Sequence, residues 1–188
     1  RAGTVTLTAT TTGKSFSNVN GTTFYNLVFD GVGGGWTMDS TVIVTMSGDL
    51  SILHGTVAAT GLSSMTVVGN FLNNGTFTAP ATGTSFSLRG NYTNNGTFNH
   101  NGGTVSFSKN SGVADSTISG SLTGTNAFYD VLFDNGPVNG SVTSETILNN
   151  MDILHNLYAD GANGLYIVVN MPPLMTVGGC IINAGSLK

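Results

Sequence analysis

Two histidines, each with an aspartate shortly before it, are the residues of this chain best suited to do chemistry. Asp49 precedes His54, and Asp152 precedes His155. An imidazole that is oriented by a carboxylate can act as the general base of a serine hydrolase. Each histidine, however, ends a matching Ile-Leu-His string, and a catalytic site is seldom duplicated with every structural repeat. The recurrence therefore predicts histidines at strand ends, without a catalytic or metal-binding role.

The serines that could act as nucleophiles beside these histidines are Ser51 and Ser40. Neither lies in a Gly-x-Ser-x-Gly motif, which in hydrolases exposes the nucleophile on a sharp turn. The third histidine, His100, lies in an Asn-His-Asn-Gly turn. We predict that the chain has no catalytic residues and is not an enzyme.

The carboxylates are too dispersed to predict a metal or glycosidase site. The chain has 9 Asp and Glu residues among 188. Paired glycosidase carboxylates, about 5–10 Å apart, could arise only by stacking, for example of Asp30 near Asp49. A calcium site needs several carboxylates among about six to eight oxygen ligands, and no Gly-Gly-x-Gly-x-Asp repeat is present. Asx turns explain the Asp-Gly sequences, so we predict no metal and no cofactor.

The composition also excludes classes of partner. Only 7% of the residues are charged, and the 5 basic residues are scattered, so no basic patch for nucleic acid is expected. No apolar run reaches the roughly 18 residues of a membrane-spanning helix, so we expect no membrane insertion. The single cysteine, Cys180, lies in an apolar Cys-Ile-Ile string and is predicted to be buried.

Aromatic side chains outside the repeated core pattern are the remaining candidates for binding. If exposed, their rings could stack on the sugars of surface glycans. The candidates are Tyr25, Trp36, Tyr129 and Tyr158.

A repeat with a period of 21 residues determines which elements must position all these residues. Gly-Asn-Phe-Leu-Asn-Asn-Gly-Thr-Phe at 69–77 returns as Gly-Asn-Tyr-Thr-Asn-Asn-Gly-Thr-Phe at 90–98. A repeat this short cannot enclose a core and must stack on its neighbours, which predicts a solenoid. Alternating apolar and polar residues, bounded by Asn-Gly and Gly-Gly turns, predict β-strands. We predict an all-β fold, a parallel β-helix; the alternative is an antiparallel β-sandwich, which Asn-Gly hairpins would also suit.

Each turn of the β-helix, called a rung below, is predicted to hold three short strands. At about 21 residues per rung the chain gives about nine rungs. Side chains one period apart should stack: Phe71 on Tyr92, Phe77 on Phe98, Asn73 on Asn94 and Asn74 on Asn95. The denser apolar strands at 41–46 and 165–169 are expected to be buried on both sides.

A longer repeat overlies the short one. Gly-Thr-Val at 3–5 returns at 103–105, and Phe-Tyr-Asn-Leu-Val-Phe-Asp at 24–30 returns as Phe-Tyr-Asp-Val-Leu-Phe-Asp at 128–134. We predict one solenoid segment, 1–188, with long units at roughly 3–102 and 103–188. Neither end shows a polar capping repeat, so we expect end-to-end contact with copies of itself or with further repeats of a longer chain.

The strings Thr-Val-Val-Gly-Asn-Phe-Leu-Asn-Asn-Gly-Thr-Phe, Gly-Thr-Val-Ser-Phe and Phe-Tyr-Asp-Val-Leu-Phe-Asp resemble the repeats of long bacterial cell-surface β-strand-repeat proteins. These proteins are similar to autotransporter and filamentous-haemagglutinin passengers. The resemblance implies a right-handed parallel β-helix, secretion, and a structural or adhesive role outside the cell. We therefore expect an extracellular stalk or filament segment; the alternative is a carbohydrate-binding or adhesin module that uses exposed aromatics.

Overall fold

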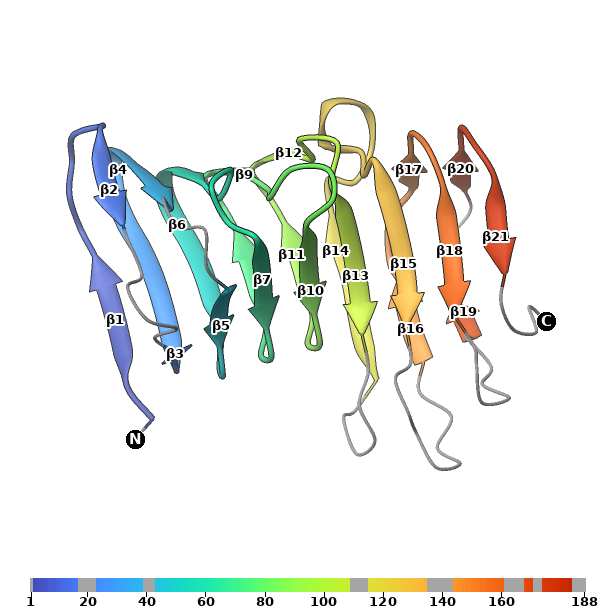
Figure 1. The fold of residues 1–188 in the computed structure, drawn as a ribbon, viewed down its shortest axis with the longest axis horizontal. Coiled ribbons are helices and arrows are strands. Elements are labelled where there is room, and N and C mark those ends of the chain that lie inside the picture. The colour runs from blue at the N-terminus through green and yellow to red at the C-terminus, as the bar shows by residue number, and fades with distance from the viewer. Residues whose placement is uncertain are drawn as a thin grey trace.

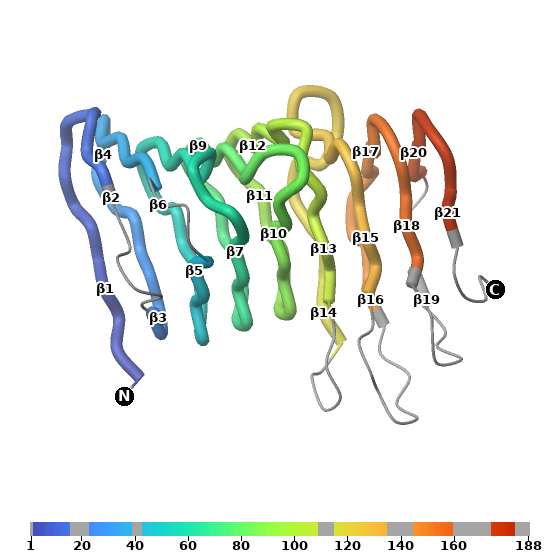
Figure 2. Tube along the Cα trace, in the orientation of Figure 1, coloured from blue at the N-terminus to red at the C-terminus, as the bar shows by residue number. Residues whose placement is uncertain are grey.

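The computed structural model describes residues 2–16, 23–38, 43–108, 115–134, 144–160, 168–170 and 174–183. Over these residues the chain is a parallel β-solenoid, in which each strand pairs with the equivalent strand of the next rung (Figure 1). The Cα trace winds along one axis from β1 to β21 (Figure 2). All strand pairs of the described part are parallel, so the antiparallel sandwich is excluded.

An 11-stranded sheet forms two faces of the solenoid. Its first face is the path β1 (Thr4–Leu7), β4 (Asn26–Met38), β6 (Leu50–Ala58), β8 (Phe71–Asn73), β11 (Tyr92–Asn94), β14 (Ser116–Gly120), β16 (Ser144–Ile147) and β19 (Val168–Asn170). The second face holds β2 (Lys14–Phe16), the ends of β4 and β6, β9 (Thr76–Thr78) and β12 (Thr97–Asn99). The long strands β4 and β6 thus bend across two faces, whereas the next two rungs break at Asn74-Gly75 and Asn95-Gly96, between β8 and β9 and between β11 and β12.

An 8-stranded sheet forms the third face. It contains β3 (Thr23–Phe24), β5 (Ile43–Met46), β7 (Ser64–Val67), β10 (Ser85–Leu88), β13 (Thr104–Ser108), β15 (Asp130–Asp134), β18 (Leu157–Asp160) and β21 (Ile181–Asn183). A separate pair, β17 (Met151–Ile153) and β20 (Met175–Val177), follows the first-face strands of the last rungs. Within the described residues the only helical element is one 3₁₀ turn, Gly124–Asn126, and no helix there is long and apolar enough to cross a membrane.

The predicted period holds in the middle of the solenoid, is longest in the rungs that follow, and is 24 residues between Leu157 and Ile181 near the C-terminal end. Equivalent side chains are 21 residues apart between the rungs of β8 and β11. The separation becomes 26 residues at Thr93 and Ser119, and 29 at Ser116 and Glu145. The prediction of about nine rungs was too high, since over the described residues the third face has 8 strands. Longer corners, which a period measured on two copies cannot include, account for the difference.

The core is a column of rings, as the repeat predicted. Phe71 pairs with Tyr92 and Phe77 with Phe98 in adjacent parallel strands, at centroid distances of 5.3 and 6.3 Å. All four side chains are buried, because alternate residues of each short strand point inward. Phe128 extends the column to the next rung, 5.5 Å from Phe98.

Two asparagine ladders run beside the ring column. Asn73 Nδ2 donates to Asn94 Oδ1 at 2.8 Å, and both residues are fully buried. Asn95 Nδ2 donates to Asn74 Oδ1 at 3.0 Å on the exposed side of the same corner. Both predicted pairs are confirmed; Asn73 and Asn94, however, are the inward-facing last residues of β8 and β11 rather than corner residues.

The two units of the long repeat do not lie one above the other: a shift along the solenoid axis does not bring the first unit onto the second. In the first unit, Thr4 pairs with Asn26 on the first face. In the second unit, the matching pair of Thr104 and Asp130 lies on the third face. Equivalent segments of the two units therefore lie on different sides of the solenoid, because the unit length is not a whole number of rungs.

Two burial predictions were wrong. Ile43 in β5 is 58% exposed, so this strand is buried on one side only, through Val44 and Met46. Cys180 is exposed because it lies on the last described rung, where no described strand covers it. The side chains of the dense strand predicted at 165–169 lie outside the described residues.

One core ring carries a hydroxyl that the core does not satisfy. Tyr92 is fully buried, its Oη has no hydrogen-bond partner among the described residues, and burial raises the pKa of this hydroxyl well above its usual value. Tyr92→Phe should therefore raise the free energy of unfolding by about 1 kcal/mol. Because burial raises the pKa in the folded state only, the unfolded chain deprotonates first, and the folded protein loses further stability as the pH rises above about 10.

Urea denaturation of wild type and Tyr92→Phe at neutral pH and above pH ~10 measures both effects. The difference in stability between the two proteins should widen at the higher pH. A variant less stable than wild type at neutral pH would show that the hydroxyl has a partner.

Candidate functional site

The histidine–aspartate pairs form, but with other aspartates than the sequence suggested. His54 Nδ1 lies 2.7 Å from Asp30 Oδ1, across neighbouring strands β6 and β4. The side chains are 56% and 42% exposed. Asp49 instead accepts hydrogen bonds from Asn70. Asp49, the aspartate that precedes His54 along the chain, is therefore not its hydrogen-bond partner, which comes from the neighbouring strand.

His155 repeats the chemistry at a different place in the rung. Its Nδ1 lies 2.9 Å from Oδ1 of Asp130, which also accepts the Asn156 N–H at 2.8 Å. Asp152 accepts the Thr176 hydroxyl and the Gly124 N–H instead. His54 lies within β6, whereas His155 lies in the corner before β18. The matching Ile-Leu-His strings are thus not equivalent positions in space.

No serine completes a triad among the described residues. Ser51 precedes His54 by three positions in β6, which separates their Cα atoms by about 10 Å in an extended strand. No hydrogen bond joins the two side chains. Ser40 lies outside the described residues. In each dyad an imidazole faces a carboxylate, and no hydrogen bond between described residues joins a serine to His54 or His155.

A column of three rings stands at the corner that contains His155. Tyr129 stacks on His155 with centroids 4.9 Å apart and on His100 at 5.4 Å, with interplanar angles of 19° and 20°. Both faces of the Tyr129 ring are therefore covered by imidazoles. Face-on stacking against a sugar, the usual mode of an aromatic glycan platform, is blocked at Tyr129.

The other candidate aromatics divide by exposure. Trp36 is 4% exposed and packs edge-to-face on Phe29 at 5.2 Å, so its assignment to an exposed binding surface was wrong. Its niche exists because Gly34 and Gly31 have no side chain: a Cβ there would lie 2.6 and 2.9 Å from the ring. Tyr25 is 45% exposed, and Tyr158 is half-buried and accepts a hydrogen bond from Asn156.

Sequence reasoning missed an Asx ladder along the corner that enters the first face. Each side-chain oxygen accepts the backbone N–H of the equivalent residue one rung later, at 2.7–3.0 Å. The accepting side chains, in order, are Asn26, Asp49, Asn70 and Asn91, and the ladder ends on the Thr117 N–H. The available signal was an Asn or Asp at or directly before the start of four successive strands, β4, β6, β8 and β11. The ladder satisfies corner N–H groups that strand pairing leaves open.

A second, shorter ladder serves the third face. Asp130 Oδ1 accepts the Asn156 N–H, and Asn156 Oδ1 accepts the Cys180 N–H at 2.9 Å. The acids Asp49 and Asp130 are thereby structural acceptors. Among the described residues, no group of three His, Cys, Asp or Glu side chains could hold a metal ion.

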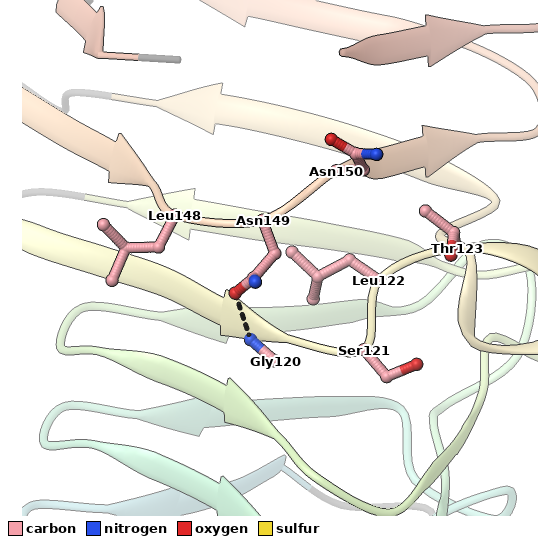
Figure 3. A pocket seen from close by; sticks show the side chains of 7 residues that line it. All are labelled: Gly120, Ser121, Leu122, Thr123, Leu148, Asn149 and Asn150. Atoms are coloured by element: carbon pink, nitrogen blue, oxygen red, sulfur yellow. Dashed lines mark hydrogen bonds between the residues drawn. The ribbon is translucent and has the colours of Figure 1, made fainter. Parts of the chain in front are cut away.

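An open groove lies between the end of β14 and the corner that follows β16. Asn149 Oδ1 accepts the Gly120 N–H across it at 2.8 Å (Figure 3). The lining residues are Gly120, Ser121, Leu122, Thr123, Leu148, Asn149 and Asn150. The groove offers amides and hydroxyls but no charged or aromatic side chain, so it presents no acid, base or stacking platform.

No protein-family model matches this chain, and no match was found among curated proteins or solved structures.

Replacing both histidines with glutamine, His54→Gln with His155→Gln, should leave any measured binding unchanged. A histidine–aspartate contact with an exposed imidazole is worth less than about 1 kcal/mol, so the double variant should fold. Isothermal titration calorimetry with divalent metals and assays with ester and glycoside substrates measure the outcome. Loss of a bound metal or of a hydrolytic activity in the double variant would contradict the structural role.

Proposed function

We propose that this chain is a structural segment of a secreted protein of the bacterial cell-surface β-strand-repeat type, and that it catalyses no reaction. Its role is to act as a stiff spacer or filament segment outside the cell. The observation that carries the proposal is the continuity of the contacts between rungs. Backbone pairing, the ring column and the asparagine ladders all join each rung to the next.

The surface and the candidate chemistry support the same function. His54 and His155 pair with Asp30 and Asp130, the ladder acids Asp49 and Asp130 accept backbone N–H groups, and no metal-ligand cluster occurs among the described residues. A surface solvated by hydroxyls and amides, with 7% charged residues overall, suits a passive spacer. The proposed partners are copies of this chain or further repeats of the same β-solenoid, stacked end to end.

Labelling of intact source cells with an antibody against this chain tests the proposed location. The expected result is labelling of intact cells and loss of the signal after mild protease treatment, while a cytoplasmic marker protein stays intact. Labelling that appears only after the cells are opened would contradict a surface role.

Single-molecule pulling tests the proposed mechanics. The described segment should unfold in large cooperative events, and Asn94→Ala should lower the unfolding force because it removes a contact between rungs. Gradual extension at low force in both proteins would contradict the role of a stiff spacer.

A second candidate function, glycan binding, is favoured by one side chain. Tyr25 is 45% exposed beside a hollow lined by Ala2, Thr23, Phe24 and Ser47. Its ring could stack on a neutral sugar. In a glycan-array assay, Tyr25→Ala should abolish binding, whereas Tyr129→Ala should not, since both faces of that ring are covered. Equal binding by wild type and Tyr25→Ala would exclude this function.

A further inference from the structure

Two corners of identical sequence, one rung apart, differ in how their reactive atoms are bonded. Asn-Asn-Gly-Thr-Phe occupies 73–77 and again 94–98. In each corner an exposed asparagine precedes a glycine: Asn74 before Gly75, and Asn95 before Gly96. In an Asn-Gly sequence the glycine nitrogen can attack the asparagine side-chain carbonyl, because glycine has no side chain to shield its nitrogen.

The attacking nitrogen is held in only one of the two corners. The Gly96 N–H donates to the Asn73 carbonyl at 3.0 Å. The Gly75 N–H donates to no acceptor among the described residues. Attack by Gly96 nitrogen must first break a hydrogen bond, whereas attack by Gly75 nitrogen does not.

The carbonyl under attack differs as well. Asn95 Nδ2 donates to Asn74 Oδ1 at 3.0 Å. This bond polarises the Asn74 carbonyl and stabilises negative charge on its oxygen during attack. The same bond holds Asn95 Nδ2, the nitrogen that would have to leave if Asn95 reacted. Nucleophile, carbonyl and leaving group therefore all favour reaction at Asn74.

We infer that Asn74 is a site of spontaneous modification, deamidation through a succinimide. The Gly75 nitrogen forms a bond to Asn74 Cγ, the Cγ–Nδ2 bond breaks, and the Gly75 proton leaves with the amide nitrogen as ammonia. Water then opens the ring at either carbonyl, which yields aspartate or isoaspartate at position 74. No oxidant, metal or enzyme is required.

Packing between rungs explains why both glycines are present. A Cβ at position 75 would lie 2.4 Å from the Gly55 carbonyl oxygen, and one at position 96 would lie 2.0 Å from that of Gly75. The fold also accommodates the aspartate product: Asp49 already accepts from Asn70 Nδ2 at 3.2 Å in the neighbouring ladder. An aspartate at 74 can keep accepting from Asn95.

The test is peptide mapping by mass spectrometry after incubation of the folded chain in mildly alkaline buffer. Asn74 should convert about five- to thirtyfold faster than Asn95, the ratio expected for one or two hydrogen bonds. Synthetic peptides 70–79 and 91–100 are the matched control, and in them the two Asn-Gly sequences should react at the same rate. Asn74→Gln should remove the fast site, while Asn95 stays slow because the Gly96 N–H remains bonded to the Asn73 carbonyl.

Equal conversion of the two asparagines in the folded chain, or faster conversion of Asn95, would overturn the inference. Conversion of both peptides with none in the folded chain would overturn it as well, since the corner would then protect Asn74.

Discussion

Phe77→Ala should lower the free energy of unfolding by about 3–5 kcal/mol, the range for truncating a buried aromatic side chain. Phe77 is fully buried and contacts three rings: Phe71 at 5.2 Å, Phe86 at 5.3 Å and Phe98 at 6.3 Å. These rings belong to strands on all three faces, so no single strand can move inward to fill the cavity. Chemical denaturation monitored by circular dichroism measures the change.

Phe77→Leu is the matched control, because it keeps the site apolar and partly filled. Its cost should be clearly smaller than that of Phe77→Ala. A cost below about 1 kcal/mol for the alanine variant would show that Phe77 does not belong to the core.

Asn94→Ala is expected to have the second-largest effect, a loss of about 2–4 kcal/mol. Asn94 Oδ1 accepts from Asn73, and Asn94 Nδ2 donates to the Ser121 carbonyl at 2.8 Å. Asn94 is fully buried, so water cannot replace these bonds without opening the core. The variant also leaves a small cavity at the end of β11.

A double-mutant cycle separates the free-energy cost of losing the Asn73–Asn94 hydrogen bond from the cost of the cavity. Asn73→Ala combined with Asn94→Ala should cost about 1 kcal/mol less than the sum of the single variants, because their shared hydrogen bond is lost only once. Asn95→Ala, on the exposed ladder, is the control and should cost less than about 1 kcal/mol. If the stability costs of Asn73→Ala and Asn94→Ala simply add, the two side chains are not directly coupled.

The central rungs could be predicted from sequence because period and strand pairing coincide there. Phe71 and Tyr92 are one period apart and pair directly, and the same holds for Asn74 and Asn95. An alternating strand also determines which side chains point inward. The aromatic column followed from these two facts alone.

The candidate chemical residues were harder to place, because their partners depend on the lengths of the corners. Asp30 reaches His54 only because β4 and β6 pair with a register shift beside Asp30, which no period reveals. Trp36 is buried because Gly31 and Gly34 on its own strand, and Gly55 on the next rung, make room for its ring. The burial of Cys180 was predicted from its own apolar string, whereas exposure depends on the strands stacked beside it.

The placement of the two long units on different faces limits how many ligands one receptor could engage. Tyr25 enters a strand of the first face, and its counterpart Tyr129 enters a strand of the third face. A flat receptor approaching from one direction therefore meets one copy of this corner and not the other. Avidity arises only when two sites can be engaged at once, so for such a receptor the pair of units is monovalent despite its duplicated sequence.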